Sequence, residues 1–209
     1  MQLNVPVIGI LRGVDAGWFG EVMAASFAAG LEAIEVTMNT PGAEKIVAAH
    51  REKVPAGRLL GMGTIRNIEE ARRAADSGAM FLVSPNLDEA VIAFARRRGI
   101  PMVAGALTPT EVYRARRAGA DLIKVFPCAA LGGPGYIRAL RGPFDDIPLV
   151  AVGGVTLDNL ADYRAAGAWG VGAGPAMFGA EALGQRDIEA VARHTAQFIS
   201  RCRAVFDRV

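Results

Sequence analysis

A helical stretch that ends in glycine and leads directly into a short apolar segment recurs along this chain of 209 residues. Glycine in the left-handed conformation commonly ends a helix, and an apolar segment after it favours a buried strand. The glycines fall about 20 residues apart, or about twice that where one unit lacks the mark, which is typical of a strand–helix repeat. The five instances are "FAAGLEAIEVTM", "AADSGAMFLVSP", "RRRGIPMVAGAL", "RRAGADLIKVFP" and "YRAAGAWGVGAG".

Eight strands are predicted once the apolar segments without a glycine mark are added. Near-continuous apolar strands that alternate with helices indicate a parallel sheet covered by helices on its outer face. Eight units predict an α/β fold of the (β/α)8 TIM-barrel type, formed by a single domain over residues 1–209. An open, doubly wound sheet is the alternative, but no GxGxxG follows the first strand. The predicted strands are 5–12, 31–38, 58–64, 80–85, 101–107, 121–127, 148–154 and 169–174, with a closing helix over 187–206.

Composition and charge narrow the classes of partner. A hydrophobic fraction of 52% with 21% charged residues is typical of a globular, soluble protein. No apolar stretch approaches the roughly 20 residues of a membrane span, and the first residues lack the pattern of a signal peptide, so we expect a cytoplasmic protein. The net charge is +2, and the arginine clusters lie at predicted helix ends without interleaved aromatic residues. This pattern argues against nucleic acid as a partner.

One lysine lies inside a predicted core strand. Lys124 is one of only three lysines, against 20 arginines, and has apolar neighbours on both sides in "DLIKVFP". Burial lowers the pKa of a lysine, and a partly neutral amine attacks carbonyl carbons, which arginine does not do because it stays protonated. Two interpretations remain open from the spacing alone. Lys124 is either a nucleophile that forms a Schiff base or a structural lysine whose ammonium reaches a carboxylate or solvent.

A second ionisable residue, Glu35, lies in the apolar segment "AIEVTM". Strand alternation places it on one face with Ala33 and Thr37. If this face points into the barrel, Glu35 lies near Lys124 and can carry protons to and from a substrate. The alternative, which the pattern leaves open, is an ion pair that neutralises Lys124 or Arg12. Further polar or site-forming residues at predicted strand ends are Arg12, Asn39, Thr64, Ser84 and Pro85.

Two glycine-rich segments, "AVGGVT" (151–156) and "GVGAG" (170–174), end the last two predicted strands. Barrels of this type often bind phosphate there through backbone amides, which the two glycine-rich ends favour; tight turns at the barrel rim are the alternative. Pro175 has no N–H and removes one possible donor. Both histidines, His50 and His194, fall in helical segments rather than at strand ends. We therefore expect no metal and no cofactor.

Six short blocks follow one another along the chain: "GILRG" (9–13), "EVTMNTP" (35–41), "GMGT" (61–64), "LVSPN" (82–86), "KVFP" (124–127) and "AVGGVT" (151–156). In this order they resemble the class I KDPG/KHG aldolases, which act on 2-keto-3-deoxy-6-phosphogluconate or 6-phosphogalactonate. The resemblance runs the length of the chain and implies a Schiff-base aldolase that needs no metal, forms homotrimers and cleaves a 2-keto-3-deoxy phosphosugar acid.

The resemblance also implies roles for individual residues. Lys124 would be the Schiff-base lysine and Glu35 the general acid and base. Arg12 and Thr64 would contact the carboxylate end of the substrate. The phosphate would be held by Gly153, Gly154 and Gly174, and the remaining substrate-binding residues would be Asn39, Ser84, Pro85 and Phe126.

The identity of the substrate depends on a few positions. Family members that act on the gluconate substrate usually have arginine where this chain has Asn39. The segment "NTP" (39–41) therefore favours 2-dehydro-3-deoxy-6-phosphogalactonate as the substrate. The family often has serine where this chain has Pro175. The alternatives are an aldolase for the gluconate epimer or for 4-hydroxy-2-oxoglutarate, a phosphate-binding barrel isomerase, and a catalytically silent sugar-phosphate binder.

Overall fold

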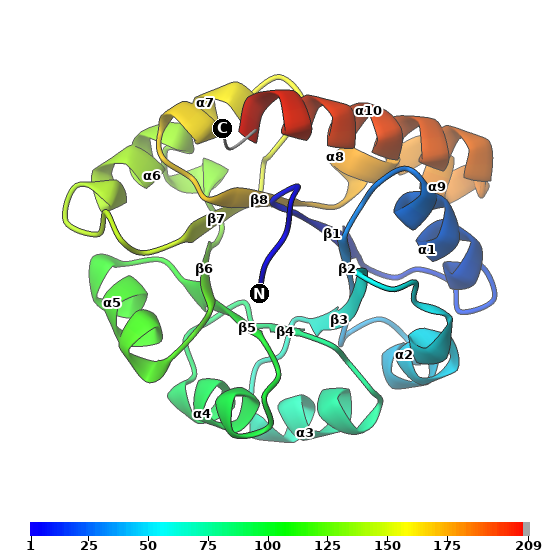
Figure 1. Cartoon of the computed structure of the whole chain (residues 1–209), viewed down its shortest axis with the longest axis horizontal. Helices are drawn as coiled ribbons and strands as arrows, with labels where there is room; N and C mark the ends of the chain where they lie inside the picture. Colours follow the sequence, from blue (N-terminus) through cyan, green and yellow to red (C-terminus); the bar gives the residue numbers. More distant parts are fainter. Residues whose placement is uncertain (207–209) are drawn as a thin grey trace.

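A computed structural model describes residues 1–206, which form a closed barrel of eight parallel strands in the order β1 to β8 (Figure 1). Each strand pairs with the next along the chain, and β8 pairs with β1 to close the barrel. This architecture confirms the (β/α)8 prediction over the open sheet. The strands are β1 (Val7–Leu11), β2 (Ala33–Thr37), β3 (Leu59–Gly63), β4 (Leu82–Val83), β5 (Met102–Ala106), β6 (Leu122–Val125), β7 (Leu149–Val152) and β8 (Gly170–Ala173).

Helices surround the barrel and separate consecutive strands (Figure 1). The long helix over 188–206 confirms the predicted closing helix and packs against the first helix. The helices are α1 (Phe19–Ala28), α2 (Ala43–His50), α3 (Ile68–Asp76), α4 (Glu89–Arg97), α5 (Pro109–Ala118), α6 (Pro134–Arg141), α7 (Leu160–Ala165), α8 (Pro175–Phe178), α9 (Ala180–Gln185) and α10 (Ile188–Phe206), with short 3-10 turns at Arg51–Lys53 and Ala129–Leu131. No helix in the described part of the chain has the length and apolar character that crossing a membrane requires.

The five glycines of the repeated helix–strand pattern lie at helix ends, as predicted. Gly119 follows α5 with φ of 100°, and its N–H bonds back to the carbonyls of Ala115 and Arg116. This left-handed backbone is strained for any residue with a Cβ, which explains the residue type. The other four marking glycines, at 30, 78, 99 and 167, also have φ between 66° and 98°. Each of the five glycines therefore lies where the backbone after a helix needs a positive φ.

One predicted strand is much shorter than expected. The segment 80–85 contains only two strand residues, in β4. Backbone bonding continues past both ends, because Met62 donates to the carbonyl of Phe81 and Ser84 donates to that of Val103. The segment therefore belongs to the barrel wall although its regular pairing is brief.

Apolar side chains fill the barrel interior as well as the layer between strands and helices. The interior cluster consists of residues that alternate along the strands, as the period of two requires. Its members are Ile8, Ala33, Phe81, Val83, Val103, Leu122, Val150 and Val152. Lys124 and Glu35 lie on the same strand faces, two residues beyond Leu122 and Ala33, so both point inward.

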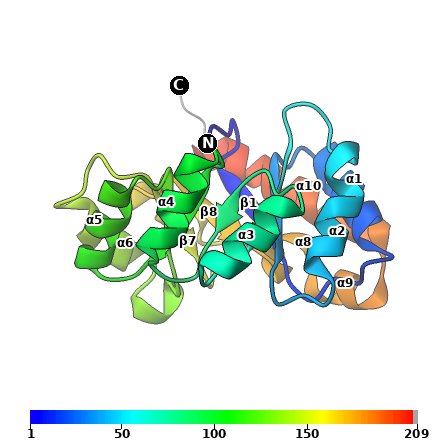
Figure 2. The ribbon, with the colours of Figure 1, turned by 90° about the horizontal axis from the view of Figure 1, so that it is seen from below.

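The N-terminal segment closes the amino end of the barrel. Its trace lies across the middle of the ring in Figure 1, and Figure 2 shows the N-terminus at one end of the barrel. Met1 and Leu3 pack against the interior cluster. The amino group of Met1 lies 3.2 Å from Oδ1 of Asp121, whose Oδ2 accepts a hydrogen bond from the amide of Met102. The amino end is therefore a packed and hydrogen-bonded base for the site at the other end.

Candidate active site

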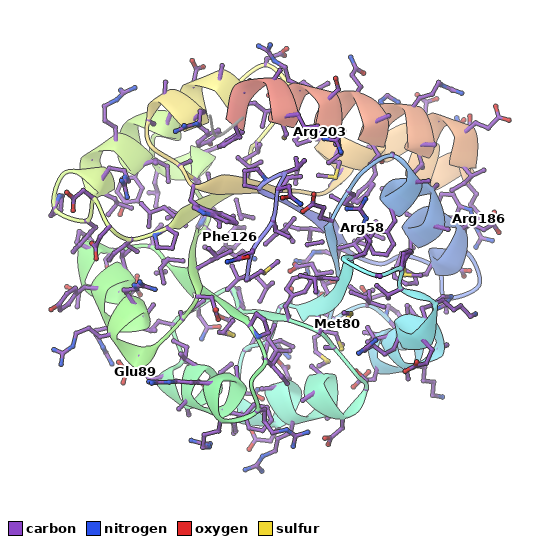
Figure 3. All side chains as sticks on the ribbon, viewed as in Figure 1. Arg58, Met80, Glu89, Phe126, Arg186 and Arg203 are labelled. Carbon is purple, nitrogen blue, oxygen red and sulfur yellow. The ribbon has the colours of Figure 1, made fainter. Side chains whose placement is uncertain are left out.

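A cavity of about 540 Å³ lies at the carboxyl end of the strands. This is the end at which barrel enzymes place their reactive groups. Figure 3 shows the labelled Phe126 beside β6, inside the ring of helices, whereas Glu89 lies on the outer side. The cavity is lined by Ile10, Arg12, Thr64, Pro85, Lys124, Phe126, Val152, Gly153, Gly154, Val155, Thr156, Gly172, Ala173, Gly174, Pro175 and Ala176.

Lys124 brings a buried amine to this cavity. It is 6% exposed, and its neighbours in register are Gly105 on β5 and Val150 on β7. Its Nζ lies 5.1 Å from the ring centroid of Phe126. Burial lowers the pKa of Lys124 and outweighs the opposite effect of the Glu35 carboxylate. A lowered pKa favours the neutral amine that a nucleophile requires.

Glu35 is a buried carboxylate without a partner. It is 1% exposed, and neither of its oxygens has a hydrogen-bond partner within residues 1–206. Burial raises the pKa of Glu35 to about 7, even though nearby Lys124 and Arg12 act to lower it. A group with this pKa gains and loses a proton readily near neutral pH. Glu35 does not line the cavity, but it interacts electrostatically with two residues that do.

The space for the Glu35 carboxylate comes from a glycine on the next strand. A Cβ at Gly63 would overlap this carboxylate, so a side chain there would displace it. Gly63 pairs in register with Thr37, two residues after Glu35. The second glycine of "GMGT", Gly63, is therefore needed at this place because any side chain there would collide with the Glu35 carboxylate.

Arg12 is held by two polar side chains at the mouth of the cavity. Its Nη1 donates to Oδ1 of Asn39 at 2.7 Å, and its Nη2 donates to Oγ1 of Thr64 at 3.3 Å. Thr64 has φ of 60°, in the left-handed region that a β-branched residue rarely adopts. Such strain is found at functional sites when the surrounding structure enforces it. The arrangement holds an exposed guanidinium in the cavity lining, close enough to Lys124 to lower the pKa of that lysine.

Backbone amides of the loop after β7 form another part of the cavity lining. Gly153 and Gly154 have φ of 93° and 77°, and in the described part of the chain the amides of residues 153–155 have no hydrogen-bond acceptor. Consecutive free amides of this kind favour an anion. Asn159 holds the loop, because its Nδ2 donates to the carbonyl of Gly154 at 2.8 Å and its Oδ1 accepts from the amide of Thr156 at 2.9 Å. Pro175 begins α8 and contributes no amide.

The structure brings most of the predicted site residues together, with three exceptions. Glu35, Asn39 and Ser84 do not line the cavity. Ser84 is 1% exposed; its hydroxyl donates to the carbonyl of Asn86 at 2.8 Å and accepts from the amide of Gly105 at 3.0 Å. This geometry favours a role in fixing the loop after β4 over the predicted contact with a substrate, which stays a prediction.

Several residues of the site were not predicted. Thr156 and the apolar residues 10, 152 and 176 line the cavity, and Asn159 shapes the glycine loop. A Thr-x-x-Asn spacing directly after "GGV" is the one signal that indicates a side-chain bridge within this loop. Apolar lining residues carry no such signal, because they look like any other core position.

Metal ligands do not gather in this part of the molecule. Within residues 1–206, no group of three or more His, Cys, Asp and Glu side chains is arranged to hold a metal ion. His50 and His194 lie in α2 and α10, outside the barrel. Cys128, in the loop after β6, is fully buried, and burial raises the pKa of its thiol, which favours packing over reactivity.

The fold and the cavity together define a (β/α)8 barrel with the features of an enzyme site, because a buried amine and a carboxyl of raised pKa lie near one another at the carboxyl end of the strands. Residues 3–194 match the sequence family described as "KDPG and KHG aldolase". The chain belongs to this family of aldolases, and it is a carbon–carbon lyase that acts on keto-deoxy phosphosugar acids.

Individual relatives differ in their substrates. The chain is 36% identical over 203 residues, 97% of each chain, to the 2-dehydro-3-deoxy-6-phosphogalactonate aldolase of Escherichia coli K12. It is also 36% identical over 161 residues to the 2-dehydro-3-deoxy-phosphogluconate aldolase of Treponema pallidum, covering 77% of this chain and 75% of the relative. A solved structure described as "Native KDPGal structure" has a TM-score of 0.92 at 33% identity, with 100% and 99% of the two chains covered.

Proposed function

We propose that this protein reversibly cleaves 2-dehydro-3-deoxy-6-phosphogalactonate to pyruvate and glyceraldehyde 3-phosphate through a Schiff base on Lys124. The observation that carries the proposal is the pair formed by a buried amine of lowered pKa and a buried glutamate with a pKa of about 7 and no partner. Neither group is arranged for structural stability, because each loses solvation without a direct hydrogen bond to the other.

The reaction begins when the neutral amine of Lys124 attacks the C2 ketone and forms a carbinolamine. Loss of water gives an iminium, which withdraws electrons from the C3–C4 bond. Glu35, acting through a water molecule, removes the proton of the C4 hydroxyl, and the C3–C4 bond breaks. The aldehyde leaves, and the electron pair remains on the lysine-bound fragment as an enamine. Protonation at C3 and hydrolysis of the iminium release pyruvate and restore the amine.

Binding of the substrate divides between the two sides of the cavity. Arg12 and Thr64 bind the carboxylate beside the ketone, where a guanidinium supplies a charge-assisted hydrogen bond. The amides at Gly153, Gly154 and Gly174 bind the phosphate; the free donors of residues 153–155 and the position of Gly174 in the cavity lining favour this role. Pro85 and Phe126 form apolar walls between these two ends.

Asn39 is the residue on which the choice of epimer rests. The gluconate and galactonate substrates differ only at the C4 hydroxyl, and a polar residue that pairs with one epimer rejects the other. The asparagine in "NTP", where gluconate members usually have arginine, supports the galactonate substrate. Its Oδ1 accepts from Arg12, so its amide nitrogen is the group available to a substrate. Pyruvate release measured with both epimeric phosphosugar acids tests this, and a higher kcat/KM for the gluconate epimer would reverse the assignment.

Borohydride trapping tests the central step. Incubation with pyruvate and borohydride should reduce the iminium to a stable adduct, which mass spectrometry of the digested protein would locate on Lys124. An isomerase that only polarises a carbonyl gives no adduct, and a silent binder releases no pyruvate from either substrate. An adduct on Lys45 or Lys53 in place of Lys124 would also refute the proposal.

We further propose that the protein is a single-domain homotrimer of the cytoplasm. The family resemblance of the whole chain supports the trimer, and a composition without an apolar segment of membrane length supports the location. Light scattering coupled to size-exclusion chromatography should give three times the chain mass of 21.9 kDa.

A further inference from the structure

Thr40, in the loop after β2, is a buried threonine that does not line the cavity. It is 3% exposed, and its neighbour Thr37 at the end of β2 is fully buried. The backbone around Thr40 is fixed, because its amide donates to the carbonyl of Thr37 at 2.8 Å and its carbonyl accepts from Ala43 at 3.0 Å. A buried hydroxyl in so rigid a setting needs its own hydrogen-bond partners.

The hydroxyl of Thr40 joins two loops of the site. Its Oγ1 accepts a hydrogen bond from the amide of Gly13 at 2.9 Å. It also lies 3.0 Å from Oγ1 of Thr37, and either hydroxyl can be the donor of that bond. Gly13 directly follows Arg12 and has φ of 67°. The loop after β1 is thus tied to the loop after β2 at the residue next to Arg12.

The tie complements the bonds made by the guanidinium of Arg12. That group reaches Asn39 and Thr64, but the Arg12 side chain is exposed and long, so its position depends on where its backbone is held. The bond between Gly13 and Thr40 fixes this backbone from a buried position outside the cavity lining. A long side chain positioned at both ends loses less entropy on binding a carboxylate.

We propose that Thr40 is a positioning residue for Arg12, through the Gly13 amide, and thereby sets the affinity for the carboxylate of the keto acid. This inference rests on the proposed role of Arg12 in binding that carboxylate. Thr40→Val keeps the side-chain shape but removes the acceptor. It should raise the KM for pyruvate about tenfold, the effect of one lost buried hydrogen bond, and leave kcat within about twofold.

The test uses exchange of the C3 protons of pyruvate with deuterated solvent, followed by NMR. This half-reaction needs the iminium and its proton transfers but no phosphate. Thr40→Ser retains the hydroxyl and should restore most of the affinity. Thr195→Val is the matched control, because Thr195 is equally buried and its hydroxyl donates to Val191 within α10 at 2.8 Å, far from the cavity. It should leave the KM unchanged.

A double-mutant cycle with Arg12→Ala decides whether Thr40 acts through Arg12. Thr40→Val should raise the KM in the native background and add nothing in the Arg12→Ala background. Equal effects in both backgrounds, or an unchanged KM in the native background, would overturn the inference while leaving the role of Arg12 intact. An unchanged KM in Arg12→Ala itself would instead refute the proposed role of Arg12. Thr40→Ala serves the same cycle if the valine variant does not fold.

Discussion

Two buried glutamates, three positions apart, show how differently the two ends of the barrel use charge. Glu32, at the amino end, is 6% exposed and accepts hydrogen bonds from the amide of Asn4 at 2.8 Å and from its Nδ2 at 3.3 Å, with Arg58 at 3.8 Å. Glu35, toward the carboxyl end, is 1% exposed and has no hydrogen-bond partner in the described structure. A buried carboxylate with hydrogen-bond partners stabilises the fold. A buried carboxylate without such partners has a raised pKa, which suits it to proton transfer.

The same contrast holds for other groups at the two ends. At the amino end, Asp121 accepts hydrogen bonds from both the N-terminus and Met102. At the carboxyl end, Lys124 is buried with a lowered pKa and Thr64 has a left-handed backbone. Residues that carry out chemistry commonly reduce stability, which the rest of the fold must supply. Substitutions at the two ends should therefore have opposite effects on activity and stability.

Replacement of Lys124 is the largest expected effect. Lys124→Met should reduce pyruvate release by at least about 10⁴-fold, since no other group supplies the nucleophile. The variant should also melt at a higher temperature at pH 7. The unfolded lysine keeps its ordinary pKa of 10.5 while the folded one has a lowered pKa. The destabilisation is therefore complete below the folded-state pKa and disappears as the pH rises to 10.5.

The matched control for this variant is Lys45→Met, in the exposed part of α2. It should keep full activity and change the melting temperature little. A Lys124→Met variant that lost stability would show that the amine is held by stabilising interactions like those of the amino end. The contrast between the two ends of the barrel would then be wrong.

The paired substitutions Glu35→Gln and Glu32→Gln test the contrast directly. Glu35→Gln should lower kcat by about 10² to 10⁴, the usual contribution of a general acid or base. Because the pKa of Glu35 is raised to about 7, we expect the kcat/KM of the native protein to fall below about pH 7, and Glu35→Gln should remove this fall. Glu32→Gln should leave kcat and the pH profile unchanged and cost about 1 to 2 kcal/mol of stability, because Asn4 and Arg58 lose a charged partner. Rate profiles and chemical denaturation of both variants provide the measurements.

The pH dependence of stability gives a second test of Glu35. The folded pKa of about 7 lies above the ordinary value of 4.5. Between these two values the folded protein binds more protons than the unfolded chain, so stability falls as the pH rises through this window. Above pH 7 the full cost remains, and Glu35→Gln should there be more stable than the native protein. Equal stability of the two proteins at pH 8 would contradict the raised pKa.

Much of the fold and the ionisable centre of the site could be predicted from the sequence. Glycine at helix ends and ionisable residues in apolar strands are local signals, and they located the barrel units, Lys124 and Glu35 correctly within the fold. The bridges made by Thr40 and Asn159 had to come from the structure, since threonine and asparagine are common in loops and their partners depend on tertiary position. Ser84 shows the same limit, because the pattern placed it at a strand end but did not reveal that its hydroxyl turns away from the cavity.

Thr64→Gly should separate stability from activity in a single residue at the carboxyl end. Relief of the left-handed backbone is worth roughly 1 to 3 kcal/mol, and the greater flexibility of unfolded glycine takes back about 1 kcal/mol, so a net gain near 1 kcal/mol is expected. Loss of the hydroxyl that accepts from Arg12 should raise the KM for pyruvate about fivefold. Arg186→Gly is the control, because Arg186 also has a left-handed backbone, with φ of 54°, but lies outside the cavity. It should not change the KM.

The smallest expected effect concerns Asn159, a polar residue at the carboxyl end that is bonded as fully as those at the amino end. Asn159→Ala releases the carbonyl of Gly154 and the amide of Thr156, so the free amides lose their fixed arrangement. The KM for the phosphosugar acid should rise about threefold, while pyruvate exchange, which needs no phosphate, should stay unchanged. Asn67→Ala removes a comparable side-chain bond at the start of α3 and should alter stability alone. A slowing of pyruvate exchange in Asn159→Ala would mean that this loop also supports the amine end, and the division of the cavity into two binding sides would be wrong.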